Sequence, residues 1–318
     1  MKNKCILPIF LTVLLTSCSN NAKPIESKIF CFDTYIEAKL YQGNNDNLKD
    51  IEDIINTYDK LTDNYKARGV NNVFTINQTN DEVEVDRELF GLLTNAVSMS
   101  EFEGSNFNPL CGSLAKKWKE SLNKKEVLSQ TVIEEEVNKI VNTHLMFGSD
   151  NKVQRIGDGE IDLGGIAKGY TLDKVLDYLN EKGITQFLIN GGSSSILLGE
   201  KNTKDGFFNV GLKDVNNAYL KLKNCFVSTS SISEQSAVID GVTYSHIINP
   251  HTGSAVSVND AVIVVSNTGM LGDVLSTSMM MNSLDEIKTL ENQFNIKTIV
   301  IRDGSVVYQN EALEVSYH

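Results

Sequence analysis

Residues 162–170 read Asp-Leu-Gly-Gly-Ile-Ala-Lys-Gly-Tyr and carry the pattern in this chain that most suggests chemistry. A short apolar run ends at residue 163, and the apolar spacing after the two glycines predicts a helix that stops at Gly183. A glycine turn at a helix N-terminus gathers unpaired N–H groups at the positive end of the helix dipole, which suits phosphate. Lys168 adds a cation there, and Asp162 adds an acceptor. An ordinary strand-to-helix turn has the same pattern, so this segment alone leaves both interpretations open.

Asp273 and Thr277 are a second pair with chemical potential. They stand four residues apart in the helical pattern of residues 271–281, which places them on one face, one turn apart. A carboxylate beside a hydroxyl is a hard oxygen donor set, which suits Mg²⁺ better than zinc or copper. The same spacing is common in surface and capping pairs, so the pair by itself is a weak signal.

His246 stands in the run Tyr-Ser-His-Ile-Ile-Asn-Pro at residues 244–250, beside an apolar pair and just before a proline turn. Histidine can exchange a proton near neutral pH. A lone histidine beside apolar residues is more often a hydrogen-bonded structural residue, and spacing alone favours that interpretation. A hydroxyl cluster at residues 228–231 and Glu234 precede it in the sequence.

Two common nucleotide-binding motifs are absent from the sequence. It contains no Gly-x-x-x-x-Gly-Lys-Ser/Thr, so a P-loop is not supported. The glycines at residues 157–159 are followed by Asp162 where a dinucleotide fingerprint needs its third glycine, and by an expected strand where it needs a helix.

The N-terminus has the pattern of a bacterial lipoprotein signal. Two lysines precede the apolar residues 5–15, and Leu-Thr-Ser-Cys closes the run at Cys18. We expect residues 1–17 to be a signal peptide, Cys18 to be lipidated, residues 18–28 to be a polar tether and residues 29–318 to be the functional domain. A plain secretory signal with an incidental cysteine is the alternative.

The chain is acidic and has few cysteines. Removal of residues 1–17 takes away Lys2 and Lys4 and no acid, which changes the formal net charge from −12 to −14. Such a surface argues against nucleic acid and against broad electrostatic adhesion to anionic lipid. The three cysteines beyond Cys18 have neither zinc-site nor disulfide-framework spacing, and we interpret them as structural.

The order of the expected elements indicates an α+β domain. Strands are expected at residues 30–41, 153–156, 160–163, 187–189, 196–198 and 261–265, and helices at residues 47–65, 86–101, 126–141, 166–181 and 271–281. A short helix should carry Trp118, residues 71–78 should form a polar loop, short strands should succeed one another over residues 210–243, and residues 296–307 should form a hairpin. We therefore expect one domain with a mixed or antiparallel sheet and flanking helices.

The joint order of the motifs resembles the ApbE family of FAD:protein FMN transferases, often lipid-anchored at the outer face of the bacterial membrane. The motifs are Gly-x-x-Phe-Asn-Pro at residues 104–109, Asp-Leu-Gly-Gly-Ile-Ala-Lys-Gly at residues 162–169, Asn-Gly-Gly at residues 190–192, Ser-Thr-Ser at residues 228–230, His-Ile-Ile-Asn-Pro-His-Thr-Gly at residues 246–253 and Asp-x-x-x-Thr at residues 273–277. The resemblance runs from about residue 30 to residue 307. It implies a single α+β, T-fold-like domain that binds FAD and Mg²⁺.

The resemblance also implies roles for individual residues. It implies that Mg²⁺ is bound by the Ala167 carbonyl and by the side chains of Asp273 and Thr277. It also implies an FAD-binding site that is lined by Asp162, Lys168, Asn190, Gly191 and Gly192. His246 would be the catalytic residue. The implied reaction moves the FMN half of FAD onto a threonine hydroxyl of a target protein, a membrane electron-transfer subunit, and releases AMP. Hydrolysis of FAD to FMN and AMP, or flavin binding without catalysis, would be the alternatives.

The chain departs from the family pattern at three places. Ser231 stands where the family commonly has glycine, and Asn249 stands where it commonly has aspartate. Residues 233–235 replace a Tyr-Glu-Arg pattern with Ser-Glu-Gln. An asparagine cannot act as a base, so no role that needs a carboxylate carries over to Asn249. Contacts between the ligand and the loop at residues 231–235 do not carry over either.

Overall fold

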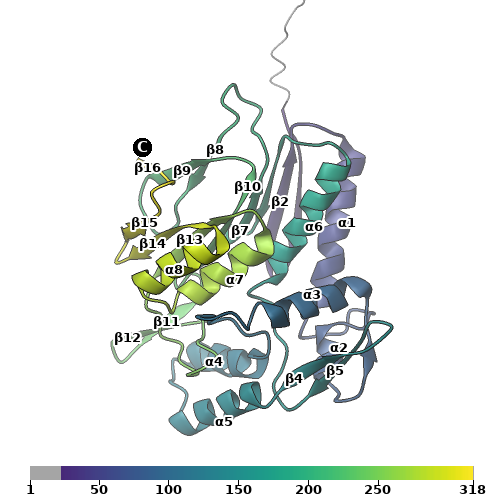
Figure 1. The fold of residues 1–318 in the computed structure, drawn as a ribbon, viewed down its shortest axis with the longest axis vertical. Coiled ribbons are helices and arrows are strands. Elements are labelled where there is room, and N and C mark those ends of the chain that lie inside the picture. Colours follow the sequence, from purple (N-terminus) through teal and green to yellow (C-terminus); the bar gives the residue numbers. More distant parts are fainter. Residues whose placement is uncertain (1–22, 318) are drawn as a thin grey trace, which may run out of the picture.

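The computed structural model describes residues 23–317, which form an α+β fold around one large antiparallel sheet (Figure 1). In spatial order its strands are β1 (Ile25–Cys31), β2 (Thr34–Leu40), β6 (Phe187–Gly191), β7 (Ser195–Leu198), β10 (Cys225–Ser231), β13 (Ala261–Ser266), β14 (Lys297–Arg302) and β15 (Ser305–Gln309). Every neighbouring pair in this sheet is antiparallel. The fold class expected from the sequence is confirmed.

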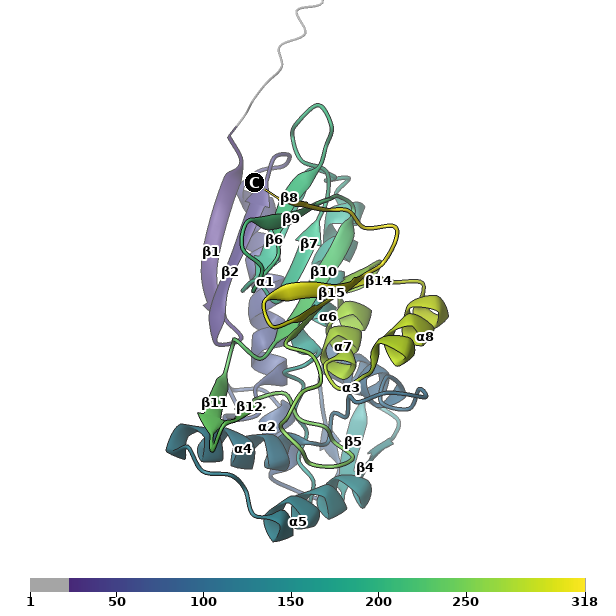
Figure 2. The same cartoon turned by 90° about the vertical axis from the view of Figure 1, so that its left-hand side faces the viewer.

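Helices cover one face of the sheet, and a smaller sheet covers part of the other (Figures 1 and 2). The covering helices are α1 (Asn45–Thr62), α6 (Ala167–Glu181), α7 (Gly269–Met279) and α8 (Leu284–Phe294). On the opposite face lie β8 (Phe208–Gly211), β9 (Ala218–Leu222) and β16 (Val315–Tyr317). β13 is buried at every position because successive side chains enter the cores on its two faces, Val262 toward α7 and Ile263 toward β9.

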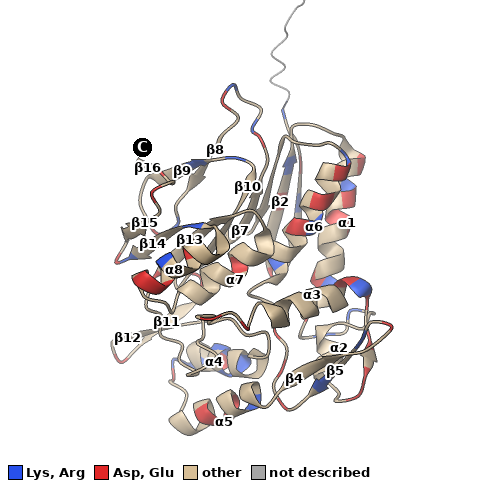
Figure 3. Ribbon diagram, viewed as in Figure 1, with Lys and Arg blue, Asp and Glu red and all other residues tan. Residues whose placement is uncertain are grey.

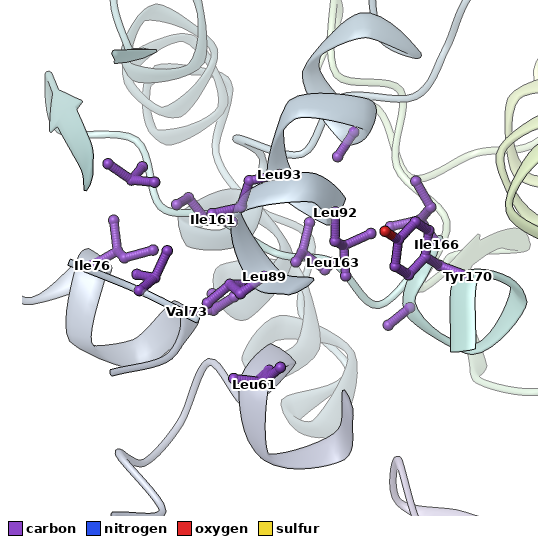
Figure 4. Close-up of a cluster of buried hydrophobic side chains, with 14 of the residues drawn as sticks. Leu61, Val73, Ile76, Leu89, Leu92, Leu93, Ile161, Leu163, Ile166 and Tyr170 are labelled. Carbon is purple, nitrogen blue, oxygen red and sulfur yellow. The ribbon is translucent and has the colours of Figure 1, made fainter. Parts of the chain in front are cut away.

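A second group of elements packs beside the N-terminal end of α6. It comprises α2 (Val73–Asn77), α3 (Arg87–Ser98), α4 (Gly112–Lys124), α5 (Gln130–Val141), β3 (Val83–Glu84), β4 (His144–Phe147), β5 (Lys152–Ile156) and the two-stranded ribbon of β11 (Ser236–Ile239) and β12 (Val242–Ser245). Leu89, Leu92 and Leu93 of α3 are fully buried and form the centre of its core (Figure 4). This core holds the segment that leads into α6.

The structure corrects three of the expected elements. Residues 30–41, expected as one strand, form the β1–β2 hairpin, which turns at Phe32 and Asp33 with φ of 52° and 56°. The expected loop at residues 71–78 contains α2, whose first turn is capped by Asn72. Residues 160–163 are not a strand, because only an isolated bridge between Cys111 and Glu160 pairs that segment.

Two further differences concern the start of β1 and the elements that the sequence did not predict. β1 begins at Ile25, so residues 25–28, which the sequence assigned to the tether, belong to the sheet. The elements β3, β4, α8 and β16 were not predicted. Residues 1–22, which include the expected signal peptide and Cys18, lie outside the described residues. From residue 23 to residue 317, no helix is long and apolar enough to cross a bilayer.

Candidate active site

A cavity of about 230 Å³ lies where the N-terminus of α6 and the middle of α7 meet the end of β10 and the base of the β11–β12 ribbon. Asp162, Lys168, His246, Asp273 and Thr277 all line it. These five residues come from segments up to 115 positions apart in the sequence. The fold therefore brings together the carboxylates, the cation, the hydroxyl and the imidazole that the sequence singled out.

The approach to α6 is anchored by alternating side chains. Ile161 and Leu163 are buried in the core beside α3 (Figure 4), which leaves Asp162 between them facing the cavity. The backbone N–H of Asp162 donates to the Pro109 carbonyl at 2.8 Å, and its Oδ1 accepts the N–H of Gly164 at 2.7 Å. This segment keeps the alternation of a strand without a strand partner, and it fixes the glycine turn.

Asp273 is the only charged residue of α7, which is otherwise tan in Figure 3, and it is 7% exposed. Its Oδ1 accepts the hydroxyls of Ser195 at 2.8 Å and Ser228 at 2.7 Å, and its Oδ2 accepts the N–H of Gly169 at 2.7 Å. Burial raises the pKa of Asp273, while these hydrogen bonds and the charge of Lys168 oppose that rise. The site therefore holds a well-anchored carboxyl group beside a cation.

Hydroxyl groups surround the next turn of α7. Ser230 Oγ lies 3.0 Å from Ser276 Oγ and 3.2 Å from Thr277 Oγ1, so β10 and α7 share a hydroxyl network. Among the described residues, no three His, Cys, Asp or Glu side chains gather to hold a metal. A cation here would have one carboxylate and neutral oxygens as ligands, a set that fits Mg²⁺, which keeps several waters and binds substrate phosphates.

Other residues implied by the family resemblance lie outside the cavity lining. Ala167 begins α6, and its carbonyl accepts the hydroxyl of Thr171 at 2.7 Å. Asn190 Oδ1 accepts the N–H of Ser193 at 2.8 Å and shapes the β6–β7 turn, in which Gly192 has a φ of 73°. None of the residues Ala167, Asn190, Gly191 and Gly192 lines the cavity; Ser194 and Ser195 line it after the same turn.

The β11–β12 ribbon positions His246. The backbone N–H and the ring Nδ1 of His246 lie 3.0 and 3.1 Å from the Gln235 carbonyl oxygen, at the base of the ribbon. Trp118 fixes this region, since its ring stacks on Tyr244 and its Nε1 donates to the Gly253 carbonyl at 2.8 Å. His246 lines the cavity and is exposed to solvent.

Charges around His246 act in both directions on its pKa. The protein packed around the ring lowers the pKa below its ordinary value, and the cations Lys168 and Lys213 act in the same direction. The Gln235 carbonyl and Glu234 oppose that shift. The net effect is a lowered pKa, so the imidazole is neutral at neutral pH and able to accept a proton.

The departures from the family pattern have structural partners in this chain. Ser231 donates to Asp214 Oδ2 at 2.6 Å, and Ser233 donates to the same oxygen at 3.1 Å. Lys213 pairs with Glu234 at 2.9 Å between Nζ and Oε1. The loop between β8 and β9 thus contacts residues 231–234 through Lys213 and Asp214. No local pattern predicts this contact, because the loop precedes residues 231–234 by about 20 positions.

Asn249 builds the turn after His246. Its Oδ1 accepts the N–H groups of His251 at 2.9 Å and Thr252 at 3.1 Å. Its Nδ2 donates to Asn106 Oδ1 at 3.2 Å, which ties the turn to the loop before α4. Asn249 therefore has a structural role that needs an acceptor and no proton exchange.

Several cavity residues were missed by the sequence reasoning or were not assigned a role. Ser195 and Ser228 hold Asp273, yet serine-rich runs carry little information because they commonly cap and solvate loops. Phe107 and Cys111 also line the cavity. Burial raises the pKa of the Cys111 thiol to about 12, so this thiol stays protonated.

These features define an α+β protein whose cavity can hold a phosphate-bearing ligand between a cation, a hard oxygen pair and an imidazole. A family model described as the ApbE family matches residues 32–300, and the chain belongs to that family. A protein of Treponema pallidum called FAD:protein FMN transferase is 28% identical over 67% of this chain, and the match spans 64% of the Treponema protein. A Klebsiella pneumoniae protein with the same name is 29% identical over 80% of this chain and 78% of its own length.

Solved structures of ApbE proteins have the same fold. The crystal structure of the ApbE protein from Thermotoga maritima superposes with a TM-score of 0.79 at 25% identity, covering 91% of this chain and 97% of that one. The flavin transferase ApbE from Vibrio cholerae gives a TM-score of 0.73 at 19% identity, covering 91% of this chain and 98% of that one. The fold is therefore shared across nearly the whole described chain.

Proposed function

We propose that this protein is an FAD:protein FMN transferase. In the proposed reaction a threonine hydroxyl of a target protein attacks the phosphorus on the FMN side of the FAD pyrophosphate. The bond from that phosphorus to the AMP phosphate breaks, AMP leaves, and the FMN phosphate becomes a phosphoester of the target. The hydroxyl proton passes to His246, and the AMP phosphate takes up the charge of the broken bond.

One observation carries this proposal. Lys168, Asp273 and His246 line a single cavity, beside a glycine turn that leads into the N-terminus of α6. Phosphoryl transfer needs positioning and charge neutralisation more than covalent help from the protein. Lys168 supplies positive charge toward a pyrophosphate, and His246 stands at the mouth, where an incoming hydroxyl would arrive.

Asp273 and Thr277 would hold Mg²⁺ in this proposal. The carboxylate of Asp273 is buried and held by Ser195, Ser228 and Gly169, and Thr277 lies one helical turn away. The metal, when bound, neutralises charge on the phosphoryl oxygens. The Ala167 carbonyl remains a predicted third ligand, already hydrogen-bonded to Thr171, and a carbonyl oxygen has a second lone pair.

The proposal places the protein at the extracytoplasmic face of a bacterial cell membrane. Its support is the sequence pattern that ends at Cys18, whose lipidation would anchor the chain, and the acidic charge, which makes electrostatic membrane adhesion unfavourable. The target is a protein with a threonine acceptor motif, and a membrane electron-transfer subunit suits this location.

The test uses purified protein, FAD, Mg²⁺ and a peptide that carries the family's acceptor motif, Asp-x-x-Ser/Thr-Gly-Ala-Thr. Mass spectrometry of the peptide and chromatography of the nucleotides should show an FMN adduct and AMP in equal amounts. A peptide with valine in place of the last threonine is the matched control and should gain no adduct. FMN and AMP without an adduct would indicate hydrolysis, and bound FAD that stays intact would indicate a flavin-binding protein.

A further inference from the structure

Helices α6 and α7 meet through a repeated sequence spacing. Each carries glycine and aspartate four residues apart, Gly169 and Asp173 in α6 and Gly269 and Asp273 in α7. The two helices are neighbours on the same face of the central sheet (Figure 1). The two copies of the spacing lie 100 residues apart in the sequence and are adjacent in the structure.

The hydrogen bonds between the two helices are reciprocal. The N–H of Gly169 donates to Asp273 Oδ2 at 2.7 Å. In return, the N–H of Gly269 donates to Asp173 Oδ1 at 2.6 Å, and the N–H of Met270 donates to Asp173 Oδ2 at 2.9 Å. Each aspartate thus accepts first-turn N–H groups of the other helix, where unpaired donors and the positive end of the dipole favour a carboxylate.

The two glycines make this exchange possible. A Cβ atom on Gly169 would overlap the carbonyl oxygen of Gly269, and a Cβ on Gly269 would overlap the carbonyl oxygen of Gly169. The backbones of the two helices therefore touch at their first turns, and no other residue type fits either position without moving a helix. Because the two backbones touch, each carboxylate can accept N–H groups of the opposite helix directly.

Neither helix is capped by its own sequence. The N-cap residues Ile166 of α6 and Thr268 of α7 make no side-chain capping hydrogen bond. Asp173 is therefore the acceptor that satisfies the first two N–H groups of α7. Asp273, the only charged residue of α7, lies one turn after these N–H groups. Because Asp173 holds the first turn, it fixes the start of the helix that presents Asp273 and Thr277.

We propose that Asp173 is a positioning residue: by capping α7 from α6 it sets the place of Asp273 and Thr277 at the cavity. This inference rests on the proposed function, in which those two residues face a metal and a pyrophosphate. Asp173 does not line the cavity, and its effect passes through the backbone of α7. Residues that orient metal ligands in this way commonly change metal affinity or activity by about 10–100-fold.

The test compares Asp173→Ala with Asp173→Asn and with Asp177→Ala. Asp177 lies one turn further along α6 and is exposed, so it is a matched control for the loss of a carboxylate from this helix. FAD fluorescence during a Mg²⁺ titration measures binding without catalysis, transfer to the acceptor peptide gives kcat at saturating Mg²⁺, and a thermal melt reports folding.

We expect the Asp173→Ala protein to need about tenfold more Mg²⁺ for half-maximal FAD binding and to lose about tenfold or more in kcat. Asp173→Asn should fall between the alanine variant and the native protein in both measures, since its amide oxygen can accept only one of the two N–H groups of α7, and Asp177→Ala should match the native protein. A folded Asp173→Ala protein with a native Mg²⁺ midpoint and a native kcat would overturn the proposal. If that variant does not fold, the decision passes to Asp173→Asn, whose native Mg²⁺ midpoint and kcat would likewise overturn it.

Failure of the proposed function would look different. In that case the native protein would give no FMN adduct, and the proposed function would be rejected whatever Asp173 does. The positioning role would still be tested by the Mg²⁺ dependence of flavin binding. If the native protein bound FAD without any response to Mg²⁺, the positioning role toward a metal would be overturned as well.

Discussion

The ring Nδ1 of His246 lies 3.1 Å from the carbonyl oxygen of Gln235. A carbonyl oxygen can only accept, so Nδ1 carries the proton in this contact, and in the neutral ring the lone pair belongs to Nε2. The same carbonyl also accepts the backbone N–H of His246, at 3.0 Å. The ribbon of β11 and β12 therefore holds His246 in the tautomer whose Nε2 lone pair can accept a proton.

The first prediction concerns His246→Asn, which should keep FAD bound and slow single-turnover transfer by about 10²–10⁴-fold, the usual effect of a positioned proton acceptor. A thermal melt of the same sample is the control, because the loss of a structural histidine would lower stability and flavin affinity together. A variant that melts normally and transfers FMN at the native rate would remove His246 from the reaction.

The pH dependence of the native enzyme gives a second test of His246. The base must be neutral, so the rate should fall as the pH drops through the pKa of the ring. That pKa is lowered by the surrounding protein, so the fall should be centred below the ordinary value of 6.5. The rate of single-turnover transfer at saturating FAD, measured from pH 4.5 to about pH 8, gives the midpoint. A midpoint above 6.5, the ordinary pKa of a histidine side chain, would contradict the assignment.

Asp273→Asn should abolish Mg²⁺-dependent transfer, with a loss of about 10²-fold or more, because the amide lacks the charge that a hard cation requires. The amide oxygen can still accept from Ser195 and Ser228, but the amide nitrogen would face the N–H of Gly169, so the variant should fold with a lower melting temperature. Excess EDTA should have the same effect on the native enzyme, and added Mg²⁺ should reverse it. Full activity in EDTA would exclude the metal. Asp285→Asn, at an exposed position of α8, is the control and should not change transfer.

Asn249→Asp should be tolerated, because an aspartate keeps the acceptor for His251 and Thr252 and loses only the donor to Asn106. We expect it to change the free energy of unfolding by less than about 1 kcal/mol, whereas Asn249→Ala should cost about 1–2 kcal/mol by leaving two N–H groups without their acceptor. Urea unfolding measures both. An aspartate variant less stable than the alanine variant would contradict this account of the turn.

The three described cysteines should resist alkylation in the native protein. Burial raises the pKa of Cys31 and of Cys225 to about 11 and that of Cys111 to about 12, so almost no thiolate exists at neutral pH. Mass spectrometry after iodoacetamide should find these thiols unmodified until the protein is denatured. Rapid labelling of native Cys111 would show that the cavity exposes a reactive thiol.

Cys18→Ala should release the protein from membranes and leave transfer intact, since the proposed attachment runs through lipid alone. Fractionation of cells followed by a high-salt wash gives the distribution of the protein, and the peptide assay gives its activity. A variant that stays bound to membranes after the wash would point to another mode of attachment.

Local patterns of the sequence determined several features of this protein. The four-residue spacing placed Asp273 and Thr277 on one face of α7, because helical geometry depends only on neighbouring residues. The alternation of Ile161 and Leu163 around Asp162 is present in the structure, where both apolar side chains are buried. It failed to indicate that no strand pairs with this segment, since pairing depends on a partner that lies elsewhere in the sequence.

Turns without glycine were the other failure of local patterns. The alternation of residues 30–41 continues through the turn at Phe32 and Asp33. Aspartate adopts a positive φ more readily than most residues, but phenylalanine does not, so the pair carries no clear turn signal. The hairpin is fixed by its contacts, among them the N–H of Phe32, which donates to Asp59 Oδ1 at 2.7 Å. That acceptor belongs to α1, outside any local window.

The assembly of the site was decided by tertiary structure. Lys168 and His246 line one cavity only because the sheet brings α6 beside the end of β10 and the ribbon of β11 and β12. The contact between Gly169 and Gly269 had no signal in the sequence, although the spacing from each glycine to its aspartate was visible. Spacing fixes what one helix can present, whereas the close approach of two backbones, which decides what each carboxylate binds, arises only when the whole chain has packed.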